Sequence, residues 1–66
     1  MYELICEKKD CILVYKFYSE EDRAEFLQRR AKDLVLKEKS KNIYVFIDLK
    51  TNETITYEIR WLPWKK

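Results

Sequence analysis

Residues 42–62 alternate between apolar and polar side chains over two segments that flank a short turn. A period of two residues is typical of half-buried antiparallel strands, so the pattern predicts a hairpin. In the turn, 50–53, we expect Asn52 to adopt the left-handed backbone region. We expect the odd-numbered positions to form the core face: Ile43, Val45, Ile47 and Leu49 in the first strand, and Ile55, Tyr57, Ile59 and Trp61 in the second.

The opposite face of this hairpin is polar on one strand and aromatic on the other. Thr54, Thr56 and Glu58 are outward in the second strand, whereas Tyr44 and Phe46 occupy the outward positions of the first. An exposed aromatic pair on a small protein is typical of an interaction surface. The pair is therefore the first candidate for a binding site.

The first eighteen residues predict a second hairpin. Residues 2–7 alternate weakly, Lys8-Lys9-Asp10 is a polar break, and residues 11–18 are rich in β-branched and aromatic side chains. Two such segments around a short break are typical of paired strands. Because residues 11–18 are apolar on both faces, we expect this strand to be central or covered on both sides.

A helix is predicted from about residue 20 to 39. Ser19 is a suitable N-cap, acidic residues follow it, and lysines lie near the other end, as the helix dipole favours. Phe26 lies outside the predicted apolar stripe, beside Arg23 and Arg30. The stripe consists of Ala24, Leu27, Ala31, Leu34 and Val35.

The order of elements predicts the fold class α+β: a single ββαββ domain, with a four-stranded antiparallel sheet and one helix packed on one face. The expected strands are about 2–7, 11–18, 42–49 and 54–62, in one domain over residues 1–66. The second face of the sheet would then be bare. The alternative is that this second face is the core face of the first two strands, and the pattern does not determine the strand order.

Composition argues against enzymatic chemistry. The 66 residues include no glycine, which excludes glycine-rich phosphate-binding loops, and no histidine, the commonest general base and metal ligand. No carboxylate pair is distinguished by an apolar setting. We therefore predict a protein that is not an enzyme and that binds no cofactor.

The two cysteines, Cys6 and Cys11, have no second pair with which to form a zinc site, so no metal is expected. No membrane span or signal segment is visible, and we expect a cytoplasmic protein with reduced thiols. The alternative is a disulfide between Cys6 and Cys11 across the first hairpin, which the short spacing allows.

The aromatic face predicts a protein-binding module that acts by occluding a partner. The expected partner-binding residues are Tyr18, Tyr44, Phe46, Arg60 and Trp64. The partner is another protein or a second copy of the chain in a homodimer. Small proteins of this character include phage and plasmid inhibitors of host or defence proteins, so inhibition is the expected activity. The alternative is that the C-terminal tail or the helix edge covers these rings.

A second hypothesis is binding of single-stranded nucleic acid. Tyr44 and Phe46 would stack on bases, and the helix would contact phosphates through Arg23, Arg29, Arg30 and Lys32, with the aromatic Phe26 beside them in the same nucleic-acid-binding set. The formal charge of only +2, and acids on the same sheet face, weaken this hypothesis. A solvated, salt-bridged helix face explains the same charges. A third hypothesis is a small-molecule site in a dimer cleft.

Overall fold

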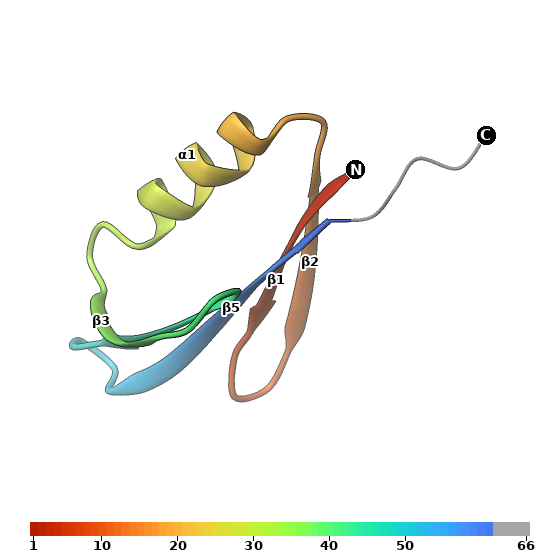
Figure 1. The fold of residues 1–66 in the computed structure, drawn as a ribbon. Helices are drawn as coiled ribbons and strands as arrows, with labels where there is room; N and C mark the ends of the chain where they lie inside the picture. The colour runs from red at the N-terminus through yellow and green to blue at the C-terminus, as the bar shows by residue number, and fades with distance from the viewer. Residues whose placement is uncertain (62–66) are drawn as a thin grey trace.

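A computed structural model describes residues 1–61. Along the chain it contains β1 (Tyr2–Glu7), β2 (Ile12–Phe17), α1 (Glu20–Arg30), β3 (Val35–Lys39), β4 (Ile43–Asp48) and β5 (Glu53–Trp61). The described strands form one sheet in the order β2-β1-β5-β4-β3, and every neighbouring pair is antiparallel. Helix α1 links the two edge strands and passes over one face of the sheet (Figure 1).

The α+β class is correct, but the prediction of a four-stranded sheet is wrong because the predicted helix is too long. Helix α1 ends at Arg30, and Val35–Lys39 forms the fifth strand. A hairpin joins this strand to β4, closed by the Ser40 amide donating to the Ile43 carbonyl at 2.9 Å. Strand β3 places Leu36 beside Phe46. Pairing with β4 thus overrides the helix propensity of a lysine- and glutamate-rich segment.

The prediction that Tyr44 and Phe46 lie on the face away from the helix is also wrong. Tyr44 lies opposite Tyr57, and Phe46 lies opposite Ile55, so both rings lie on the same face as the core positions of β5. The four residues between Asp48 and Glu53 cause this, because they pair even positions of β4 with odd positions of β5. Ile43, Val45 and Ile47 therefore lie on the other face.

Local capping and turn predictions are confirmed. Asn52 has a φ of 63°, in the left-handed region, and its amide donates to the Asp48 carbonyl at 2.7 Å. The Ser19 hydroxyl accepts a hydrogen bond from the Asp22 amide at 3.1 Å, as expected of an N-cap. Both signals depend on only a few neighbouring residues, which is why the sequence displays them.

The core lies between α1 and the centre of the sheet. Its buried side chains are Leu4, Cys6, Phe46, Ile55 and Tyr57. Phe26, predicted to lie outside the apolar face of the helix, instead packs on Tyr15 and Phe17, with ring centroids 4.6 and 5.3 Å away. These aromatic contacts hold α1 over β1 and β2.

The cysteines do not form a disulfide. Cys6 is buried opposite Leu13, whereas Cys11 is exposed at the start of the returning segment, and both thiols are free. Cys6 therefore acts as a small apolar side chain in the core.

Strand β2 is an edge strand, which corrects the expectation that it is central or covered on both sides. Ile12, Leu13 and Val14 are all exposed. The sheet face away from α1 also carries Ile5 beside Val14 and Val45 beside Thr56. This face is thus made mainly of β-branched side chains, and the large aromatic rings lie on the helix side.

Candidate functional site

An open groove of about 500 Å³ separates α1 from the β3–β4 half of the sheet. It exists because α1 packs on β1 and β2 near one edge of the sheet, and the chain then crosses to β3 at the other edge (Figure 1). The apolar lining comes from both walls: Ala24, Leu27 and Ala31 of the helix side, and Leu36, Tyr44, Phe46 and Ile59 of the sheet. We call this feature the helix–sheet groove.

The sheet wall of the groove is an ordered aromatic surface. The Tyr44 and Phe46 rings are nearly parallel, with centroids 6.4 Å apart and an interplanar angle of 13°. Phe46 also meets Tyr57 edge to face at 5.9 Å and is only 7% exposed. The Lys39 ammonium lies 5.4 Å from the Tyr44 ring centroid. Core packing therefore fixes Phe46 in the sheet wall of the groove, and half-buried Tyr44 remains accessible beside it.

The helix wall is shallow because small side chains face the groove. Ala24 and Ala31 contribute little bulk, and Leu27 lies between them, one helical turn from each. Glu20 and Gln28 supply polar atoms at the groove lining. A shallow apolar wall opposite an aromatic one leaves space for an inserted side chain.

Arg23 fixes the helix at its distance from the sheet. Its guanidinium donates to the Arg60 carbonyl at 2.9 Å and lies 5.2 Å from the Tyr2 ring centroid. Glu20 is 3.8 Å away, and Arg23 is only 7% exposed. A buried, charge-assisted hydrogen bond of this kind ties α1 to β5. Arg23 therefore positions one wall of the groove.

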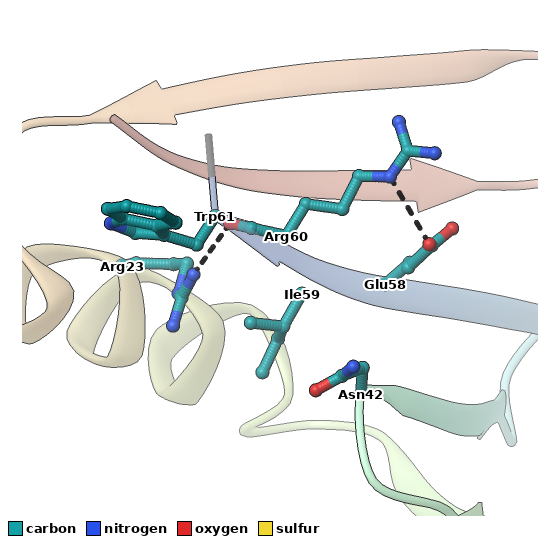
Figure 2. A pocket seen from close by; sticks show the side chains of 6 residues that line it. All are labelled: Arg23, Asn42, Glu58, Ile59, Arg60 and Trp61. Atoms are coloured by element: carbon teal, nitrogen blue, oxygen red, sulfur yellow. Dashed lines mark hydrogen bonds and ion pairs between the residues drawn. The ribbon is translucent and has the colours of Figure 1, made fainter. Parts of the chain in front are cut away.

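A second cleft, of about 550 Å³, lies where β5 extends past the beginning of β4 (Figure 2). Just beyond the paired residues of β4 and β5, the Ile59 amide donates to the Asn42 carbonyl at 2.8 Å. Figure 2 shows Ile59 pointing toward the helix, whereas Arg60 and Glu58 point to the other side of the strand and form an ion pair at 3.3 Å. The charged side chains that line this second cleft are thus largely paired within the protein. The cleft is therefore a weaker candidate for a binding site than the helix–sheet groove.

The predicted partner-binding residues do not form one cluster. Tyr44 and Phe46 lie together in the helix–sheet groove, but Arg60 points to the face away from it. Tyr18 follows β2 and lies beside Met1 and Lys16. Trp64 lies outside the described residues.

Sequence reasoning missed the residues that complete the groove: Leu36, Ala24, Leu27 and Ile59. Leu36 was assigned to a helix, which concealed its place on a strand beside Phe46. A usable signal was the Ser40-Lys41-Asn42 segment, whose turn-forming residues separate two short apolar segments.

The basic side chains of α1 make contacts within the protein. Arg29 pairs with Glu25, and the Arg30 guanidinium lies 5.1 Å from the Phe26 ring centroid. Lys32 is exposed just beyond the helix. Arg23 is buried, whereas Arg29, Arg30 and Lys32 remain exposed to solvent, and nucleic-acid binding stays a prediction.

One tyrosine has a strongly altered acidity. Burial, and then the neighbouring Cys6 thiol, raise the pKa of the Tyr57 hydroxyl far above its ordinary value of 10.0. Tyr57 is consequently a neutral core residue under physiological conditions. Within residues 1–61 there is no cluster of three or more histidine, cysteine, aspartate or glutamate side chains that could hold a metal ion.

Over the same described range, no helix has the length and apolar character needed to cross a membrane. Comparison of the chain with protein-family models, with curated proteins and with solved structures found no match.

Proposed function

We propose that the protein is a small, non-enzymatic binding module whose helix–sheet groove receives an apolar segment of another protein. The observation that supports this most is the accessible apolar wall formed by Leu36 and Tyr44 beside the buried ring of Phe46. Aromatic anchors in a preformed groove are the usual centre of a protein interface. We therefore propose the groove as the binding surface, in place of the sheet face away from the helix that the sequence suggested.

The shape of the groove favours a protein segment over a small molecule. Its volume of about 500 Å³ lies within the range of ligand pockets, but such pockets bury most of their ligand. Here Leu36 is 47% exposed and Ala24 is exposed, so the walls remain open to solvent. A partner whose contact continues beyond the groove would cover these side chains.

The proposed mechanism is occlusion. Side chains of the partner would fill the space between Leu27 and Tyr44, and the rest of this domain would block the surface around them. If the partner needs the blocked surface for its own activity, binding of this protein would inhibit the partner, in the manner of phage or plasmid inhibitors. We place this activity in the cytoplasm, where thiols such as exposed Cys11 stay reduced.

Two adjacent residues of β3 offer a matched test. Leu36 is 47% exposed in the groove, and Val35 is 48% exposed, opposite Ile47 on the other face of the sheet. Tagged wild-type protein, L36E and V35E would each capture proteins from lysate of the source cells. We expect a protein partner that wild type and V35E retain and that L36E loses, because only L36E places a charge in the groove.

The controls separate this proposal from its alternatives. Circular dichroism must show that L36E and V35E fold equally well. A partner that L36E retains, or that V35E loses equally, would contradict the groove as the binding site. Capture that disappears after nuclease treatment and falls steeply with salt would instead support nucleic-acid binding.

A further inference from the structure

The outer edge of β2 is an unpaired strand edge with few of the features that usually prevent pairing with another strand. Among residues 1–61, β2 pairs only with β1, and in Figure 1 no other strand lies along its outer side. Its apolar side chains are exposed on both faces: Ile12 by 65%, Leu13 by 39% and Val14 by 52%. Its sequence, ILVYKF, contains a single charge, Lys16. Such an edge is a template for pairing with another strand.

The opposite edge of the sheet, formed by β3, has the features that usually prevent pairing with another strand. Strand β3 has a register shift between Leu36 and Glu38, and its sequence, VLKEK, is charged at three of the five positions. Bulges and charged side chains are how natural sheets prevent edge pairing. The difference between the two edges points to β2 as the one that is covered.

The backbone of β2 determines how a second strand could pair with it. The Lys8 amide donates to the Cys11 carbonyl at 2.9 Å, so the polar groups of Cys11 point toward β1. Because these groups alternate along a strand, those of Ile12, Val14 and Lys16 point outward. An antiparallel copy of β2 must therefore align its even-numbered residues with even-numbered residues.

One such register is complementary in both polarity and charge. It aligns Ile12 with Val14 of the second copy, and Leu13 with Leu13 across the two-fold axis. It also brings Asp10, in the turn before β2, toward Lys16 of the second copy. Shifting the copies by one allowed step in one direction would pair Ile12 with Lys16 instead, and a further shift would pair Val14 with Lys16. One step in the other direction would bring Lys16 toward Lys8, a like charge.

We propose that the occupant of this edge is a second copy of the chain, joined β2 to β2 in an antiparallel homodimer centred on Leu13. The exposed apolar side chains of β2 then pair with one another, and the two five-stranded sheets become continuous. The helix–sheet groove takes no part in this contact. The dimer thus stands independently of the function proposed above.

The first test compares two edge valines by sedimentation over a range of concentrations. Val14 and Val35 are 52% and 48% exposed, and each lies on an edge strand. We expect wild type and V35K to dimerise, and V14K to dissociate with a dissociation constant raised by about tenfold or more, because symmetry introduces the lysine twice. A wild type that stays monomeric, or equal weakening by both substitutions, would overturn the proposal.

The second test addresses the register. In a C6A/C11S background, which also removes the Cys6 thiol opposite position 13, a cysteine in place of Leu13 should form an intermolecular disulfide under mild oxidation, because the two copies of position 13 face each other across the axis. A cysteine in place of Val35 should not. A dimer that V14K dissociates but that L13C fails to crosslink would overturn the register centred on Leu13.

Discussion

At the scale of single residues, Tyr57 makes the stability of the folded protein depend on pH. Its pKa is about 10 when exposed and well above that in the folded protein, so above pH 10 the unfolded chain holds fewer protons than the native one. Stability should therefore fall as pH rises through 10, by up to about 1.4 kcal/mol per pH unit from this residue. Urea unfolding of wild type and Y57F across this range would measure it.

The Y57F variant is the internal control, because it lacks the hydroxyl but keeps the ring that meets Phe46 edge to face. The remaining side chains are the same in both proteins, so their contribution to the pH profile cancels in the comparison. Parallel pH profiles of wild type and Y57F would show that Tyr57 does not carry the effect.

Asn52 has a backbone conformation that few residue types adopt easily, because its φ of 63° lies in the left-handed region. We expect N52A to lower the free energy of unfolding by about 1 kcal/mol, and N52G to leave it unchanged or raise it. Chemical denaturation of the two variants would measure the difference. Equal losses in both would mean that the Asn52 side chain, and not its backbone, stabilises the turn.

Residue-scale predictions succeeded where the signal was local and failed where it depended on pairing. Asn52 and Ser19 act on neighbours within four positions, so their roles were evident. Tyr44 and Phe46 share β4 with Ile43, Val45 and Ile47, which leaves both faces apolar. Alternation then cannot say which face is buried. The length of the turn to β5 decides it, through a register that no single position reveals.

At the scale of elements, α1 depends on its ends and anchors, because an isolated helix of 11 residues is marginal in water. The Ser19 cap satisfies the Asp22 amide, so S19A should lower the free energy of unfolding by about 1 kcal/mol. Ser40 is the matched control: its amide, and not its hydroxyl, bonds to Ile43. Equal effects of S19A and S40A in urea titrations would contradict the capping role.

Strand β3 shows why element type is harder to predict than local capping. Val35–Lys39 combines good helix formers with a continuation of the helical apolar pattern, and both features favour extending α1. The competing influence is non-local: β4 offers a free edge once β5 occupies its other side. Pairing there places Leu36 beside Phe46 and creates the groove wall.

At the scale of the whole molecule, stability and binding belong to different residues. A 66-residue domain is expected to have only about 3–10 kcal/mol of stability. F46A should remove about 3 kcal/mol or more, since Phe46 is 7% exposed, whereas L36E should change stability by about 0.5 kcal/mol. Urea unfolding would test this contrast. A large loss in L36E would assign Leu36 to the core.

Site-specific photo-crosslinking in the source cells would show whether a partner protein occupies the helix–sheet groove. Benzoylphenylalanine would replace either Leu36, in the groove, or Val35, its equally exposed neighbour on the other face. We expect a single protein adduct from position 36 and its absence from position 35. Adducts from position 35 alone, or the same adduct from both positions, would mean that the groove is not the binding site.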